Sequence, residues 1–111
     1  MINIEAVLED DGTLISCKVE GHAGSGKTGS DIVCASVSVL MNTAYAVLSD
    51  RKGITLSGGA PKPGQLWLEV KYDAKGKDFL FAVGVFLING LMSVAREYPE
   101  RCKLNIVTRR N

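Results

Sequence analysis

Histidine is almost absent from this 111-residue chain, and proline, cysteine and aromatic residues are few. The chain has one histidine, three prolines and 6% aromatic residues, and its 13 basic side chains nearly balance its 12 acidic ones, for a net charge of +1. So small a charge excludes the broad positive field of a protein whose main partner is DNA, RNA or anionic lipid. With 46% hydrophobic residues, the composition also excludes a disordered tail and predicts one globular domain over residues 1–111.

The three cysteines, Cys17, Cys34 and Cys102, are widely separated, and none belongs to a CxxC pair. A zinc site would need nearly all of them together with His22, the single histidine, so we expect neither a metal nor a cofactor. An odd cysteine count is typical of reduced thiols in a cytoplasmic protein. The first residues lack the basic segment and long apolar run of a secretory signal, which also favours a cytoplasmic location.

A segment without charges, residues 79–95, lies between Asp78 and Arg96. Its length is at the lower limit for a helix that crosses a membrane. Glycine, asparagine and serine within it favour a buried or dimer-facing helix, so we expect no membrane partner. One helix face on a domain of this size cannot hide so much apolar surface. The segment therefore predicts a homodimer.

Alternating apolar and polar residues predict strands, and an apolar period near 3.6 residues predicts helices. Residues 2–9 and 15–20 are expected to form an antiparallel hairpin around Asp11-Gly12. The first helix carries an apolar stripe made of Val33, Val37, Leu40, Met41, Ala44, Val47 and Leu48. Ser30 or Asp31 is its expected N-cap, and residues 50–53 end it. Further strands are predicted at 54–56, 66–72 and 104–108, a turn at 58–64, and a second helix at about 75–97. The order ββαββαβ predicts the α/β (α+β) class, with a single mixed sheet that carries two helices.

The glycine-rich segment Gly21–Thr28 reads G-H-A-G-S-G-K-T and matches the nucleotide-binding pattern G-x-x-x-x-G-K-[ST] in full. Three observations argue against a P-loop. The helix is expected to begin after Lys27, at the cap, whereas a P-loop helix begins at the lysine. The preceding strand is half polar and paired in a hairpin, and no apolar strand ends in an aspartate suited to hold magnesium. A P-loop-like nucleotide binder is kept as the third interpretation.

Cys34 and His22 offer different chemistry. We expect Cys34 in the first turn of the helix, where the dipole favours a thiolate and free amides could hold an oxyanion. If the glycine-rich loop folds back, His22 completes a thiolate–imidazolium pair. Such a loop is expected to be mobile until a peptide binds, and its predicted substrate-contacting residues are Gly21, Ala23, Gly24, Gly26 and Gly29. The alternative is a small core thiol at Cys34 and a solvated histidine at His22.

Residues 21–23, Gly-His-Ala, and residues 29–38, Gly-Ser-Asp-Ile-Val-Cys-Ala-Ser-Val-Ser, together resemble the signature of the bacterial ribosomal-processing cysteine proteases. The resemblance extends over the whole chain in length and element order, and Ser36 departs from it by replacing an alanine. It implies that Cys34 is the nucleophile, that His22 is the base, and that Asp31 and Ser38 support the site. Two roles for Asp31 stay open, since it could orient His22 or cap the helix.

The same resemblance implies a cytoplasmic homodimer that removes a short N-terminal extension from a large-subunit ribosomal protein. Cleavage in that family follows paired aromatic residues of the extension. The second interpretation is a non-catalytic, ribosome-associated binding protein of the same fold. Alkylation separates the two, because a cysteine protease is inactivated by iodoacetamide and a binding module is not.

Overall fold

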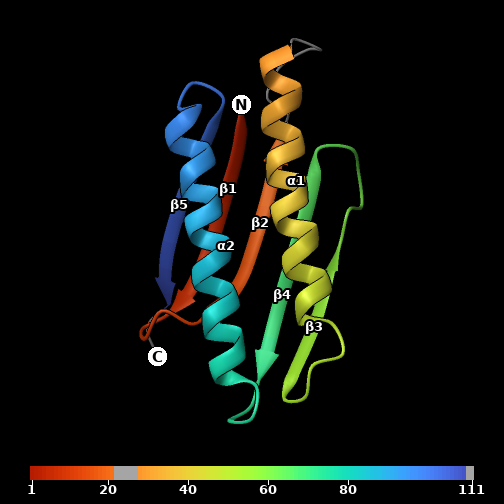
Figure 1. Ribbon diagram of the computed structural model, residues 1–111, viewed down its shortest axis with the longest axis vertical. Coiled ribbons are helices and arrows are strands. Elements are labelled where there is room, and N and C mark those ends of the chain that lie inside the picture. The colour runs from red at the N-terminus through yellow and green to blue at the C-terminus, as the bar shows by residue number, and fades with distance from the viewer. Residues whose placement is uncertain (22–27, 110–111) are drawn as a thin grey trace.

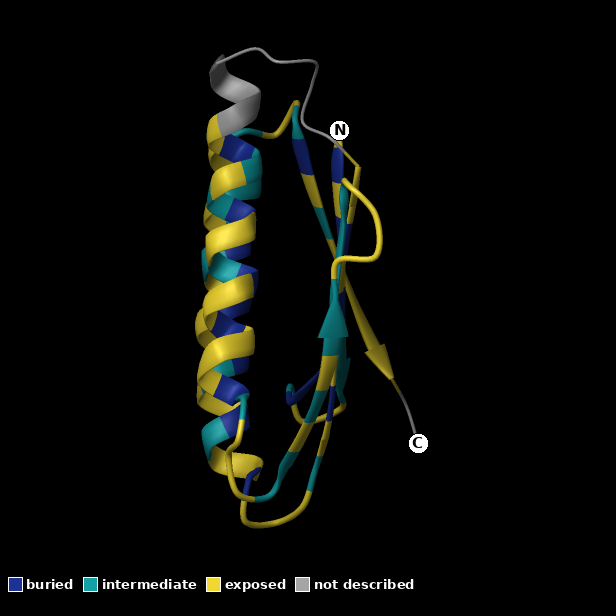
Figure 2. Ribbon diagram, turned by 90° about the vertical axis from the view of Figure 1, so that its right-hand side faces the viewer, coloured by how far each residue is buried: buried dark blue, intermediate teal, exposed yellow. Residues whose placement is uncertain are grey.

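The computed structural model of the chain describes residues 1–21 and 28–109, and of residues 28–31 it describes the backbone only. Its elements are β1 (Ile2–Glu9), β2 (Leu14–Gly21), α1 (Thr28–Leu48), β3 (Ile54–Gly59), β4 (Gln65–Tyr72), α2 (Lys77–Glu97) and β5 (Cys102–Arg109). Both helices lie on one face of the sheet (Figure 1), and the opposite face is uncovered (Figure 2). The predicted ββαββαβ order is confirmed.

The sheet is mixed, as predicted, with the strand order β3-β4-β2-β1-β5. β1 pairs with β2 in antiparallel fashion and with β5 in parallel, and β4 lies antiparallel between β2 and β3. Ile4 on β1 stands opposite Val19 on β2, and both are buried under the helices. The next pair, Glu5 and Lys18, is exposed on the other face. Alternation in the sequence therefore reflects a sheet with one covered and one open face.

Each helix packs an apolar stripe against this sheet. α1 buries Val33, Val37, Met41, Ala44 and Leu48, and α2 buries Leu80, Gly84, Leu87, Ile88 and Leu91. α2 comes close to the sheet at Gly84, where a Cβ atom would lie 3.0 Å from the Cβ of Leu14. By length and composition α2 is apolar enough to cross a membrane. Here it packs as a core helix of the two-layer fold.

The start of α1 differs from the prediction. The helix begins at Thr28, so Ser30 and Asp31 lie inside its first turn and the predicted N-cap is wrong. The predicted cap, Ser30 or Asp31, follows Gly29, a residue of low helix propensity. The N–H groups of the first turn have no hydrogen-bond partner within the helix, however. A glycine at this position therefore lowers the stability of the helix only a little. As a consequence, Cys34 is the seventh helical residue and lies in the second turn.

β3 is also longer than predicted, because Gly58 and Gly59 belong to the strand and not to the following turn. α1 crosses directly above them. A Cβ atom on Gly58 would lie 2.7 Å from the ring of Tyr45, so only a residue without a side chain leaves room for this tyrosine. The β3–β4 loop is consequently shorter than expected and spans residues 60–64.

Candidate active site

Several segments that are distant in the sequence meet at one end of the molecule, the upper end in Figure 1. The start of β1, the end of β2, the start of α1 and the β3–β4 loop all lie there. Gly21 links two of them, because its N–H donates a hydrogen bond of 2.8 Å to the carbonyl of Gly64. Its φ of +104° places a hypothetical Cβ atom against the carbonyl oxygen of Met1. A glycine is therefore required where β2 ends.

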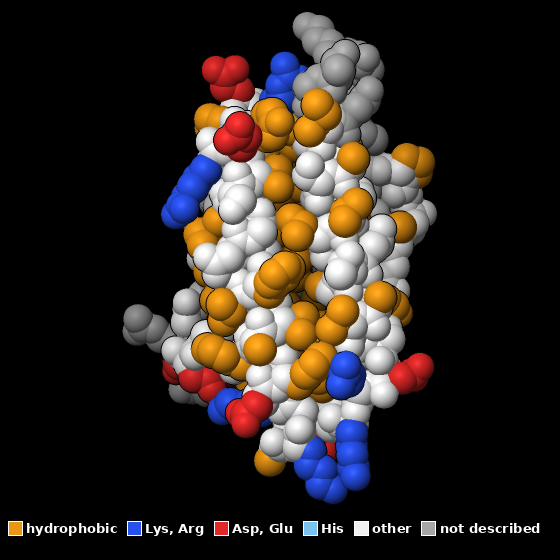
Figure 3. Space-filling model, in the orientation of Figure 1, with side chains coloured by type: hydrophobic (Ala, Val, Ile, Leu, Met, Phe, Trp, Pro, Cys, Tyr) orange, Lys and Arg blue, Asp and Glu red, His pale blue; other side chains and the backbone are white. Residues whose placement is uncertain are grey.

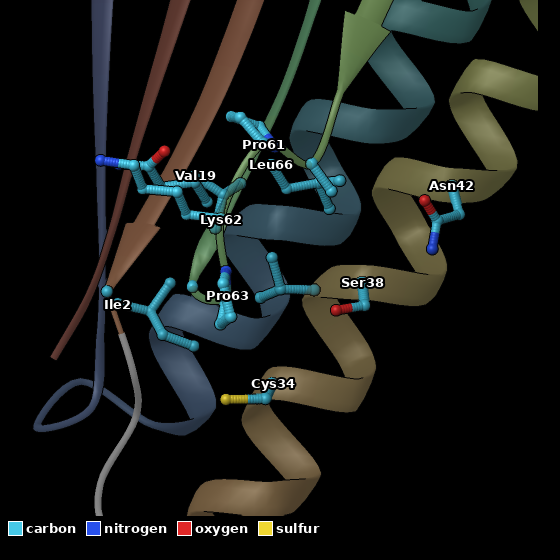
Figure 4. Close-up of a pocket in the computed structure, with 14 residues that line it drawn as sticks. Ile2, Val19, Cys34, Ser38, Asn42, Pro61, Lys62, Pro63 and Leu66 are labelled. Atoms are coloured by element: carbon cyan, nitrogen blue, oxygen red, sulfur yellow. The ribbon is translucent and has the colours of Figure 1, made fainter.

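A cleft of about 570 Å³ opens at this end, between α1 and the β3–β4 loop (Figure 4). α1 contributes Cys34, Val37, Ser38 and Asn42, and the ends of β1 and β2 contribute Ile2, Val19 and Gly21. The opposite wall consists of Ala60, Pro61, Lys62, Pro63, Gly64, Gln65 and Leu66. Polar side chains thus line the helix side, and the sheet supplies an apolar floor.

Cys34 is half-buried at the edge of this cleft. It follows the fully buried Val33 and so stands at the margin of the apolar stripe of α1. Figure 4 shows its thiol pointing away from the helix toward Ile2 and Pro63. A nucleophilic cysteine needs this combination of a backbone that is held in place by packing and a sulfur atom that a substrate can reach.

The other two cysteines have different surroundings. Cys17 is 0% exposed and Cys102 is 2% exposed, and both belong to the hydrophobic core. Burial raises the pKa of the Cys17 thiol to about 12 and also raises the pKa of the Cys102 thiol. Both groups stay as neutral thiols near pH 7 and are poor nucleophiles. Of the three thiols, that of Cys34 is the one that opens on the cleft.

The structure brings together part of the predicted site. Ser38 lies one turn beyond Cys34 on the same row of α1, and Gly21 lines the same cleft. Gly29 and Asp31 lie in the first turn of α1, where the backbone alone is described. The predicted base and the remaining loop residues, His22, Ala23, Gly24 and Gly26, lie outside the described residues, as does the predicted mobility of this loop. Gly21, the last described residue before this segment, lines the cleft.

The start of α1 changes one part of the electrostatic argument. The effect of a helix dipole falls off within the first turn, and Cys34 belongs to the second. Its own amide is therefore not among the free N–H groups at the helix end. The helix dipole therefore contributes less at Cys34 than the sequence predicted.

The structure also bears on the P-loop interpretation. The helix begins immediately after Lys27, so the expected gap between lysine and helix is wrong. The second observation stands, because β2 is antiparallel to both of its neighbours, whereas a P-loop follows a strand of a parallel sheet. β4 ends at the opposite end of the sheet from the end of β2, and the carboxylate of Asp73, which follows β4, accepts a hydrogen bond from the amide of Lys75. Among the described residues, no cluster of side chains is suited to hold a metal ion.

Replacing Lys27 with alanine is expected to leave peptide cleavage within a few fold of the wild-type rate. β2 is antiparallel to both of its neighbours, unlike the strand that precedes a P-loop, so we expect this lysine to hold no phosphate. Steady-state cleavage and a thermal melt with ATP and magnesium check the prediction. Magnesium-dependent stabilisation by ATP that disappears in the variant would restore the nucleotide-binding interpretation.

Two features of the cleft were not predicted. Asn42 lies eight residues after Cys34 and lines the cleft from the same helix. The β3–β4 loop forms the facing wall, although it is distant in sequence from every predicted site residue. The spacing of Cys34, Ser38 and Asn42 by four residues could have revealed the first feature, because such residues share one face of a helix. No local pattern could have revealed the second.

The chain is similar to known proteins over nearly its whole length. The profile of the family described as Cysteine protease Prp matches residues 1–103. The Ribosomal processing cysteine protease Prp of Staphylococcus aureus (strain Mu50 / ATCC 700699) is 26% identical over 109 residues, which cover 95% of this chain and 98% of the relative. A crystal structure of SMU.848 from Streptococcus mutans superposes with a TM-score of 0.81 and 28% identity, covering 98% of this chain and 96% of the other.

A second solved structure shares the fold. It is an essential ribosomal processing protease Prp from S. aureus in complex with a substrate peptide. It superposes with a TM-score of 0.79 and 20% identity, covering 96% of this chain and 99% of the other.

Proposed function

Because the chain belongs to the cysteine protease Prp family and is a cysteine protease, we propose that Cys34 is its nucleophile and His22 its base. The observation that carries this assignment is the cleft at the end of the sheet, on which Cys34 opens while Cys17 and Cys102 are buried. We further propose that the substrate is the N-terminal extension of a large-subunit ribosomal protein, cleaved in the cytoplasm.

The proposed reaction has two halves. The Cys34 thiolate attacks the scissile carbonyl carbon, the C–N bond breaks, and protonated His22 gives its proton to the leaving amine. A thioester between Cys34 and the N-terminal fragment remains. His22, now neutral, takes a proton from water as the water attacks the thioester carbonyl. The acid fragment leaves, and the thiolate–imidazolium pair is restored.

Ser38 and Asp31 are proposed to support the reaction of the Cys34–His22 pair. Ser38 faces the cleft one turn from Cys34 and offers a hydroxyl to the substrate or to the tetrahedral intermediate. Asp31 lies in the first turn of α1, three residues before Cys34, and its proposed role is to orient His22. Both are proposed to modulate the rate and not to carry the bond-breaking step.

The substrate assignment draws on the cleft and on the relatives. An apolar floor of Ile2, Val19 and Leu66 suits the paired aromatic residues that the family resemblance implies before the cleaved bond. The curated relative is named a ribosomal processing protease. The rim of the cleft is polar along α1, so an extended peptide can place apolar side chains inward and its backbone along the helix.

Mass analysis of a synthetic N-terminal extension peptide tests this proposal. Incubation with the full-length enzyme should yield two fragments, separated after the paired aromatic residues, and Cys34→Ala enzyme should yield none. A wild-type enzyme that leaves the peptide intact would contradict the substrate assignment. Cleavage by the Cys34→Ala enzyme would contradict the nucleophile.

A homodimer is the proposed assembly. On the side of the helices away from the sheet, an apolar groove of about 560 Å³ runs between α1 and α2. It is lined by Val39, Leu40, Thr43, Ala44, Val47, Ala82, Val83, Phe86 and Leu87. Hydrophobic side chains gather along it in Figure 3. Val39 is 64% exposed and Phe86 71% exposed, which is unusual for a face with no partner.

Phe86→Asp is expected to convert the dimer into a monomer, because a carboxylate would be desolvated at the centre of the proposed interface. Light scattering at tens of micromolar should give twice the 11.9 kDa chain mass for the wild type and a single chain mass for the variant. Val107→Asp, on β5 and outside the groove, is the control that should remain dimeric. A monomeric wild type would contradict the assembly.

A further inference from the structure

Asn42 occupies a distinctive place in the cleft. Cys34, Ser38 and Asn42 follow one another at intervals of four residues along α1, and all three line the cleft. Side chains at this spacing form one row on a helix surface. Figure 4 shows the row running away from the Cys34 thiol along the same wall. A peptide that reacts at Cys34 and lies along α1 would therefore pass Asn42.

The amide of Asn42 is available to such a peptide. Some polar side chains of the two helices turn back onto their own backbone: Ser36 donates to the carbonyl of Ile32 at 2.7 Å, and Asn89 donates to that of Val85 at 2.8 Å. Asn42 makes no such bond to any residue in the part of the chain that the structure describes. Its carbonyl and NH₂ groups remain free to accept and to donate.

The facing wall has an apolar part and a polar part, and Lys62 and Gln65 supply the polar side chains. Pro61 and Pro63 have no N–H donor, and Leu66 presents an apolar side chain. An amide of the peptide that packs against the two prolines and Leu66 would lose water without gaining a partner from them. Asn42 is the amide-bearing side chain on the helix side that can replace the lost hydrogen bonds.

The helix geometry fixes how far from the reaction this contact lies. A rise of 1.5 Å per residue separates Cys34 and Asn42 by about 12 Å along α1. An extended peptide advances about 3.3 Å per residue, so this distance corresponds to three or four residues. We propose that Asn42 is a specificity residue that hydrogen-bonds an amide group of the substrate three or four residues from the cleaved bond. The proposal rests on the proposed proteolytic function, and the amide belongs either to a side chain or to the peptide backbone.

Two scans of the cleaved extension peptide test the role of Asn42. One replaces each residue in turn with norleucine, and the other replaces each backbone amide with an ester. With wild-type enzyme, one replacement three or four residues from the cut should lower kcat/KM about tenfold, because it leaves the Asn42 amide unpaired. A penalty in the norleucine scan identifies a side-chain amide, and a penalty in the ester scan identifies the backbone.

The variant enzymes decide whether that penalty belongs to Asn42. With the Asn42→Leu enzyme, the same replacement in the peptide should change kcat/KM by no more than about twofold, because the side chain that bonds the peptide amide has been removed. Asn89→Leu makes the same replacement on a helix surface outside the cleft and should keep the wild-type penalty. Melting temperatures verify that both variants are folded.

Two results would overturn the proposal. Flat scans with wild-type enzyme would show that no amide three or four residues from the cut is recognised. An undiminished penalty in Asn42→Leu would assign the recognition to another residue. Either result leaves the proteolytic function standing, whereas an extension peptide that wild-type enzyme does not cleave removes the proposed function and this inference with it.

Discussion

Replacing Cys34 with alanine is expected to lower peptide cleavage by at least about 10³-fold while the fold stays intact, because removal of a nucleophile leaves only binding and oxyanion stabilisation. The side chain is half-buried at the rim of the cleft, so its loss opens no closed cavity. Initial rates from mass analysis and a melting curve together measure both effects. The melting temperature should stay close to that of the wild type.

Cys17→Ala is the matched control for this experiment. Cys17 is 0% exposed, and its replacement leaves a small void in the core, which costs about 1 kcal/mol of stability. The control should melt earlier yet cleave the peptide at a rate close to the wild-type rate. The reverse pattern, a destabilised but active Cys34→Ala enzyme, would make Cys34 a packing residue and remove it from the mechanism.

His22→Ala is expected to cause a loss of similar size, and the double variant with Cys34→Ala should lose no more than the single variants. The two residues act as one unit, since the imidazole both stabilises the thiolate and protonates the leaving amine. The position of Cys34 in the second turn of α1 strengthens this expectation, because the helix dipole contributes little there.

Values of kcat/KM for the two single variants and the double variant complete a thermodynamic cycle. Losses that multiply in the double variant would mean that His22 and Cys34 act independently. A His22→Ala enzyme with nearly full activity would mean that another group activates the thiol. Ser38→Ala serves as the comparison, with a smaller loss expected from a residue that supports the site.

The element order and the sheet could be predicted because local patterns determine them. Alternation in β1 and β2 reports which residues face the helices, and the stripe on α1 from Val33 to Leu48 reports the buried side of that helix. The beginning of α1 could not be predicted. The choice between Thr28 and a later cap depends on how the preceding segment meets the helix, and Gly29 is compatible with both.

Only the part of the candidate site that comes from a single stretch of sequence could be predicted. Gly21, Cys34 and Ser38 belong to one motif of two nearby segments, and the structure places all three at one cleft. The opposite wall comes from the β3–β4 loop, which reaches the cleft because Gly21 hydrogen-bonds Gly64. That contact follows from the pairing of β2 with β4. The periodicity of either segment does not predict it.

Competitive alkylation of the native protein tests the central claim, that Cys34 is the reactive thiol, most directly. A limiting amount of iodoacetamide near pH 7.5, followed by peptide mass analysis, gives the labelling rate of each cysteine. Cys34 should react much faster than Cys17 or Cys102, because burial raises the pKa of both core thiols and shields them from the reagent. His22→Ala should slow the labelling of Cys34 alone. Labelling of Cys34 no faster than that of the two core thiols would contradict the proposed mechanism.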